Sequence, residues 1–224
     1  MLKFDTMSIA ENLHDIQSQI PENVSLVAVS KTRPVDELMQ AYEAGQRVFG
    51  ENKIQEMVTK WEHMPKDVQW HMIGHVQTNK VKYMAGFVAL IHAVDSLKLL
   101  QEINKQAEKN QRTISCLLQI KIAKEDSKYG LNENEALDLL QHPLLNTLKN
   151  VRIVGLMGMA TFTKNERQLD EEFGRLQKFY NNYKTLFNFD ILSMGMSGDY
   201  PIALKHESNM IRVGSAIFGQ RKYD

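Results

Sequence analysis

Eight short apolar runs alternate with helical patterns along the chain, and this alternation limits the fold more than any other feature. The first run, residues 24–29, is apolar at every position except Ser25, which is typical of a strand buried on both faces of a parallel sheet. Eight strand–helix units in 224 residues are what a single (β/α)8 barrel of the TIM type requires. The predicted strands are residues 24–30, 47–50, 68–74, 87–94, 114–122, 151–159, 190–196 and 210–213.

An open, doubly wound α/β sheet is the main alternative to the barrel. Such sheets commonly bind nucleotides through G-x-G-x-x-G or a Walker P-loop, and neither motif follows the first predicted strand. We therefore expect one barrel domain over residues 1–224. An extra amphipathic helix precedes the first strand, because its apolar residues recur at helical spacing at Ile9, Leu13, Ile16 and Ile20.

Charge and composition exclude several classes of partner. The 27 basic residues balance the 27 acidic ones and form no dense run, so we expect neither nucleic acid nor an anionic membrane as a partner. Cys116 is the one cysteine and lies in an apolar run, which fits a core residue in a reducing compartment. With no leader, no membrane span and no extra apolar patch evident, the sequence predicts a cytoplasmic monomer.

Lys31 lies where the first predicted strand opens into the loop before a helix. The carboxyl ends of the strands carry the chemistry of (β/α)8 barrels. A lysine amine at this place can attack a carbonyl if it is desolvated or lies beside another cation, such as Arg33. The alternative is a surface lysine whose aliphatic stem passes the end of the strand.

Small residues follow the last two predicted strands, as Ser197-Gly198 and Gly214-Ser215. These neighbouring loops form the usual phosphate site of such barrels, where backbone N–H groups and hydroxyls donate to the anion. Small residues here could instead relieve crowding between strands and helices. A phosphate anchor and an imine-forming lysine are together the two attachments that a phosphorylated aldehyde such as pyridoxal 5'-phosphate needs.

Arg212 lies within the apolar eighth strand, where an isolated guanidinium would be costly. It therefore needs an acceptor near the barrel mouth. A carboxylate such as Glu51 or Asp199 is one choice. The pyridine nitrogen of the cofactor is the other.

Five runs of this sequence resemble the pyridoxal phosphate homeostasis proteins, a family that looks like the N-terminal barrel domain of alanine racemase standing alone. The runs follow one another in order over nearly the whole chain. They are residues 28–32, 49–52, 71–80, 194–199 and 211–219.

This resemblance implies that Lys31 holds pyridoxal phosphate as an internal aldimine, a Schiff base. The other residues that it places around the cofactor are Arg212 at the pyridine nitrogen, Ser197, Gly214 and Ser215 at the phosphate, and Asn52 and His75 in the pocket lining. Lys121 and Glu207 depart from the pattern, because an asparagine and a glycine are expected there.

The chemistry of these residues predicts a binding protein more than an enzyme. An arginine opposite the pyridine nitrogen leaves the ring a weak electron sink, and no second domain follows to supply another acid or base. We expect a protein that holds pyridoxal phosphate and delivers it to apo enzymes met transiently. One alternative is a weak amino-acid racemase that uses Lys31 on one face of the substrate and a group such as Tyr200 or His206 on the other. The second is a cofactor-free Schiff-base aldolase acting on a phosphosugar.

His71 and His75 are the remaining candidates for chemistry. They are four residues apart at the third strand and its exit, so they could share a face and bind a metal. No third ligand occurs at a useful spacing. We therefore expect no metal.

Overall fold

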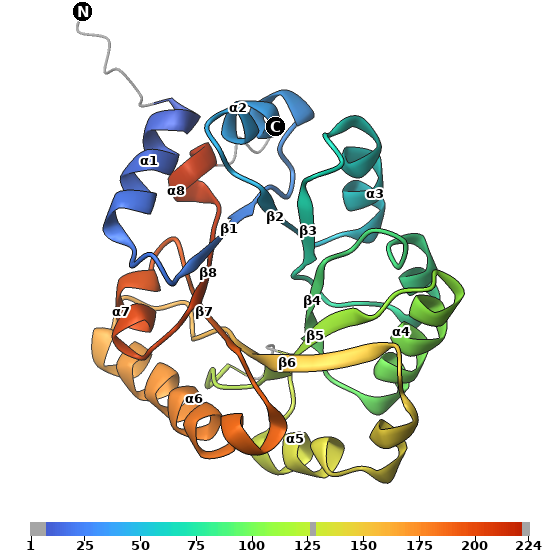
Figure 1. Ribbon diagram of the computed structural model, residues 1–224. Helices are drawn as coiled ribbons and strands as arrows, with labels where there is room; N and C mark the ends of the chain where they lie inside the picture. The colour runs from blue at the N-terminus through green and yellow to red at the C-terminus, as the bar shows by residue number, and fades with distance from the viewer. Residues whose placement is uncertain (1–7, 126–128, 221–224) are drawn as a thin grey trace, which may run out of the picture.

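The computed structural model describes residues 8–125 and 129–220, and its centre is a closed barrel of eight parallel strands (Figure 1). The strands pair in chain order, and β1 pairs with β8 to close the barrel. The predicted (β/α)8 fold is confirmed, while the ends of the predicted domain lie outside the described residues. The strands are β1 Ser25–Val29, β2 Val48–Glu51, β3 Gln69–Met72, β4 Leu90–Val94, β5 Ile114–Ile120, β6 Val151–Gly158, β7 Ile191–Met196 and β8 Met210–Val213.

Helices surround the barrel and connect successive strands (Figure 1). After β3 the sequence predicted a helix of unspecified type, and the structure has a 3-10 helix there. Phe87 was predicted to begin β4, but it lies in the turn before that strand. The helices are α1 Ile9–Gln19, α2 Val35–Glu43, α3 Ile54–His63, η1 Thr78–Tyr83, α4 Leu97–Lys109, α5 Glu133–Leu140, η2 Pro143–Thr147, α6 Glu166–Phe187, α7 Tyr200–Lys205 and α8 Ser215–Phe218.

The extra N-terminal helix is present and lies beside α8 (Figure 1). Ser8 caps α1 in a reciprocal capping box with Glu11, which satisfies amide groups that the first turn would otherwise leave without acceptors. Leu13 is buried on the inner face of α1. The Asn12 side chain donates to the Ile217 carbonyl over 3.0 Å, so α1 is bonded directly to the last helix.

Apolar side chains form two separate layers of core. One layer fills the barrel, and the other packs the outside of the strands against the helices. Cys116 is fully buried in the outer layer, as predicted. The barrel layer consists of Val27, Leu90, Ala93, Leu117, Val154, Met157 and Met210. Within residues 8–125 and 129–220, none of the helices combines the length and the apolar character that a bilayer crossing requires.

Glu207, one of the two departures from the family pattern, has a left-handed backbone with φ of 62°. A residue with a Cβ atom is strained in this region, which glycine adopts freely. The structure thus explains why a glycine is expected before β8. The Glu207 carboxylate accepts a hydrogen bond from Asn181 of α6 over 2.8 Å, which offsets part of the strain.

Gly155 permits β6 and β7 to pair closely. A Cβ atom at this position would lie 1.9 Å from the Ile191 carbonyl oxygen, and backbone atoms cannot yield as the end of a flexible side chain would. We expect Gly155→Ala to lower the free energy of unfolding by about 3 kcal/mol in urea titrations. Gly198→Ala is the control, since a Cβ atom there meets nothing within 4 Å and should leave stability unchanged. Equal stability of the two variants would contradict this account.

Candidate active site

The ends of β7, β8 and β1 lie side by side at the carboxyl face of the barrel. Arg212 of β8 is in register with Val27 of β1 on one side and with Met196 of β7 on the other. A Cβ atom on Gly214 would lie 3.2 Å from the Val29 carbonyl oxygen, so the loop after β8 reaches the end of β1. Closure of the barrel therefore brings together segments from both ends of the chain.

The loops after β7 and β8 meet at the Ser197 hydroxyl. The Gly214 N–H donates to Ser197 Oγ over 3.1 Å, and the Ala216 N–H lies 3.5 Å from the same oxygen. Ser197 is half-buried, whereas Ser215 is exposed at the start of α8. Amide donors that converge on one oxygen match what a phosphate group requires. The structure thus brings Gly214 into direct contact with Ser197, and Ser215 lies next to Gly214 in the chain, while contact of the three residues with a phosphate stays a prediction.

Lys31 directly follows the buried Ser30 at the end of β1 and is itself half-buried. The next residue, Thr32, has a left-handed backbone with φ of 66°, so the chain turns sharply beside the lysine. Arg33, considered above as a cationic neighbour of Lys31, donates to the Glu37 carboxylate and to the Gly219 carbonyl. Its guanidinium thus bonds the β1–α2 loop to the end of α8.

Arg212 is buried, and its guanidinium donates within the barrel (4% exposed). One terminal nitrogen donates to Ser193 O over 2.9 Å and to Ser193 Oγ over 2.6 Å, and the other donates to Gly158 O over 2.9 Å. Burial lowers the pKa of Arg212 to about 10, while Asp199 acts in the opposite direction. Glu51, named above as one alternative partner, instead forms an ion pair with Lys60. Glu51 is therefore not the partner of Arg212, whereas Asp199, the other carboxylate named above, acts on it through its charge.

A line of polar side chains continues from Arg212 across the barrel interior. Ser193 Oγ lies 3.5 Å from His92 Nδ1, and His92 Nε2 lies 3.0 Å from His71 Nδ1. Burial lowers the pKa of His71 to about 3. Burial is the main cause that holds the pKa of His92 well below its ordinary value, and the nearby charge of Arg212 acts in the same direction. Both imidazoles are therefore neutral at physiological pH, and the charge of Arg212 meets neutral hydrogen-bonding groups here.

Asn52 and His75 lie on the next two loops of the barrel, after β2 and β3. They line one cavity of about 200 Å³ together with Lys80. His75 is exposed, lies 3.7 Å from the Asp95 carboxylate and stacks on the Tyr129 ring. The structure thus brings these two residues to each other, and their contact with a cofactor stays a prediction.

The two histidines considered as a metal pair separate in the structure, with His71 inside the barrel and His75 at its rim. No group of three or more His, Cys, Asp and Glu side chains in the described part of the chain could hold a metal ion. Tyr200 and His206, the candidate second bases of a racemase, bond instead to surrounding helices. The Tyr200 hydroxyl donates to Gln19, and His206 contacts Asp170 and Gln177.

Comparison with known proteins identifies the family. Residues 4–222 match the family described as "Alanine racemase, N-terminal domain". A pyridoxal phosphate homeostasis protein of Vibrio alginolyticus is 38% identical, with 96% of this chain and 99% of that protein aligned. The chain belongs to the pyridoxal phosphate homeostasis protein family. The resemblance of the five sequence runs is thereby confirmed.

Solved structures of PipY, a COG0325 family member, have the same fold. PipY of Synechococcus elongatus PCC7942, determined without PLP, superposes with a TM-score of 0.89 at 34% identity over 95% of this chain and all of that one. The structure of PipY with PLP bound gives a TM-score of 0.85 at 33% identity, with the same coverage. The fold of PipY therefore extends over almost the whole of this chain.

Sequence reasoning missed two groups of residues near the site. Lys60 lies on the same buried face of α3 as Ile54 and Met57. A lysine at such a position in the sequence indicates a buried ion pair, and this signal could have been used. His92 lies in a strand that is buried throughout. A polar residue in such a strand indicates a partner inside the barrel, but not which one.

His71 should make the stability of the protein fall as the pH is lowered. The unfolded chain protonates this imidazole near pH 6.5, whereas the folded protein keeps it neutral down to about pH 3. Below pH 6.5 the unfolded state therefore binds more protons than the folded state. At pH 5 this proton binding by His71 lowers the free energy of unfolding by about 2 kcal/mol. Urea titrations at pH 7 and pH 5 should show a smaller loss for His71→Gln than for the wild type. His14 is exposed, so His14→Gln should lose as much stability between pH 7 and pH 5 as the wild type does.

Proposed function

We propose that this chain binds pyridoxal phosphate through Lys31 and holds it for delivery within the cell, without catalysing a reaction of its own. The proposal is supported most by one observation. The barrel closes so that the Lys31 strand, the buried Arg212 and the Ser197–Gly214 cluster lie on three adjacent strands. These are the amine, the ring contact and the anion site that the cofactor needs.

The donor set fits this cofactor. A guanidinium has five N–H groups. Within the described residues, Arg212 makes three hydrogen bonds to Ser193 and Gly158, so two N–H groups can donate to an acceptor on the cofactor. Ser197 Oγ collects two backbone N–H groups that a phosphate oxygen can also accept from. Gly214 permits this approach, because a side chain there would press on Val29.

When bound, pyridoxal phosphate supplies an aldehyde that condenses reversibly with a primary amine and can withdraw electrons through its ring. Arg212 donates hydrogen bonds and does not give up its proton at physiological pH, so it favours an unprotonated ring nitrogen. Ser193 and Gly158 hold the guanidinium at this place. The chain thus binds and orients the ring without activating it strongly, which favours storage and transfer over turnover.

The carrier hypothesis also agrees with the positions of the candidate bases. Two-base racemisation needs an acid or base on each face of the substrate. The Tyr200 hydroxyl bonds to Gln19 of α1, and the His206 imidazole bonds to α6, so both are engaged outside the cluster of Lys31, Arg212 and Ser197. Among the described residues these two therefore give no support to a racemase.

Lys31→Ala should abolish covalent binding. Purified wild-type protein mixed with pyridoxal phosphate is expected to develop visible absorption, and borohydride should fix a pyridoxyl group on Lys31 that mass analysis detects. Lys105→Ala, which removes an exposed lysine of α4, should behave as the wild type. A sugar-derived adduct on Lys31 would support the aldolase instead. Amino-acid racemisation that disappears in Lys31→Ala would support an enzyme.

Ser197→Ala should weaken recognition of the phosphate group. The change removes the hydroxyl at which the two loops meet, so the affinity for pyridoxal phosphate should fall about 10-fold, while the affinity for unphosphorylated pyridoxal stays the same. Titration of the visible absorption with both vitamers measures the ratio. An equal loss of affinity for the two would show that Ser197 does not contact the phosphate.

A further inference from the structure

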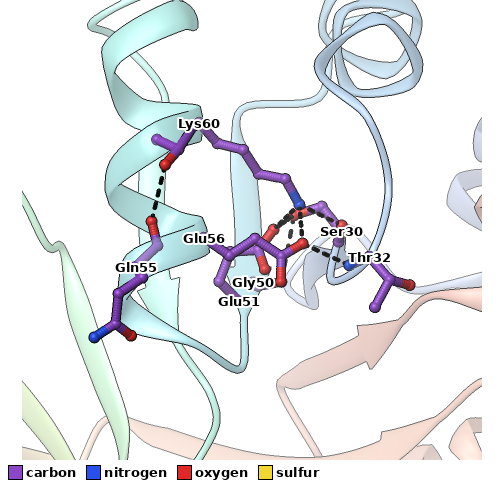
Figure 2. A network of polar contacts seen from close by, with 8 residues as sticks. Ser30, Thr32, Gly50, Glu51, Gln55, Glu56 and Lys60 are labelled. Atoms are coloured by element: carbon purple, nitrogen blue, oxygen red, sulfur yellow. Dashed lines mark hydrogen bonds and ion pairs between the residues drawn. The ribbon is translucent and has the colours of Figure 1, made fainter.

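A buried cluster of charged side chains lies behind the turn that carries Lys31 (Figure 2). Lys60 reaches from α3 toward this turn, and its ammonium lies 2.7 Å from Glu51 Oε1 and 2.7 Å from Glu56 Oε1. Glu51 is fully buried at the end of β2, and Lys60 is 5% exposed. Charged residues so deeply buried occur almost only in pairs, so this cluster is a built feature of the fold.

The cluster holds the backbone on both sides of Lys31. Before the lysine, the Lys60 ammonium donates to the Ser30 carbonyl over 2.8 Å, and the Ser30 hydroxyl donates to Glu51 Oε1 over 2.6 Å. After it, the Thr32 N–H donates to Glu56 Oε1 over 2.6 Å. Figure 2 shows these contacts converging from α3 and β2 on the Ser30–Thr32 turn.

Stability alone does not account for this arrangement. Removing two charges from water costs about as much as their attraction returns, so a buried ion pair is weak evidence of net stabilisation. Glu51 Oε2 also has no hydrogen-bond partner within the described part of the chain, which adds to the cost. Thr32 is held in a left-handed conformation that a β-branched residue does not favour. Strain of this kind commonly occurs at functional sites.

Lys60 itself is not a second attachment point for an aldehyde. An ammonium has three N–H donors, and the Lys60 group has three acceptors, from Ser30, Glu51 and Glu56. An amine must lose a proton and expose its lone pair before it attacks a carbonyl. The three acceptors and the burial of Lys60 oppose both changes.

We propose that Lys60, with Glu51 and Glu56, is a positioning residue for Lys31. The cluster fixes the Ser30–Thr32 turn so that the Lys31 amine is already placed when it condenses with the aldehyde and releases water. This inference rests on the proposed function, because it takes Lys31 as the attachment point. It adds residues that touch the turn through Ser30 and Thr32 and do not touch the cofactor.

Glu56→Ala gives the cleanest test, since it removes the acceptor of the Thr32 N–H and keeps the buried Lys60–Glu51 pair. The rate at which visible absorption develops after mixing with pyridoxal phosphate should fall about 10- to 100-fold, because a displaced nucleophile reacts slowly. Glu171→Ala, which removes an exposed glutamate paired with Arg167 and Lys124, should keep the wild-type rate. Thermal unfolding should show that both variants are folded.

Rescue by glycine separates positioning from general damage. Glycine adopts the left-handed conformation at position 32 without strain, so Thr32→Gly combined with Glu56→Ala should recover most of the lost rate. The paired change Glu51→Gln with Lys60→Met removes both buried charges. This double variant should recover the stability that Lys60→Met alone loses, yet it should still react slowly with pyridoxal phosphate.

Two different failures can be distinguished. If wild-type protein shows no absorption that depends on Lys31, the proposed function is wrong. If the wild type reacts through Lys31 while folded Glu56→Ala and Glu51→Gln/Lys60→Met react at the wild-type rate, the positioning role is wrong and the proposed function stands. Slow reaction that Thr32→Gly does not relieve would also contradict this role.

Discussion

Pairing of β1 with β8 is the constraint on which the rest of the structure depends. It closes the barrel and places Val27 beside Arg212, residues that are far apart in the sequence. The β7–β8 pairing then adds the Ser197 loop on the other side. An open sheet would separate the lysine of the first strand from the loops of the last two. The candidate site is therefore a product of closure, since no single segment contains it.

Much of the fold could be predicted because each element has a local signal. Apolar runs predicted the eight strands, and apolar residues at helical spacing predicted the extra N-terminal helix α1. Errors occur where local signals are weak, as at Phe87 before β4. The placement of Lys31 after β1 and of Ser197 after β7 follows from strand order alone. Their chemistry indicated a phosphorylated aldehyde, the family resemblance indicated pyridoxal phosphate, and their contacts with that cofactor remain a proposal.

The polar partners could not be predicted, because they are set by side chains that meet only in the folded chain. Glu51 was one possible partner of Arg212, yet it pairs with Lys60 of α3, the helix that follows β2. His92 had no expected role, yet it bonds to His71 across the barrel interior. Strand periodicity fixes which face a side chain occupies, but not which of several neighbours on that face it contacts. Which neighbour a polar side chain contacts depends on its burial and on competition among the available acceptors.

The bond between Asn12 and the Ile217 carbonyl gives α1 a consequence beyond covering the barrel. Ile217 lies within α8, whose preceding residue Gly214 shares the Ser197 hydroxyl. Any rearrangement of that loop must either carry the first helix with it or break this bond. Amide exchange in the first turns of α1 would therefore respond to any change that separates this helix from α8, at the opposite end of the chain.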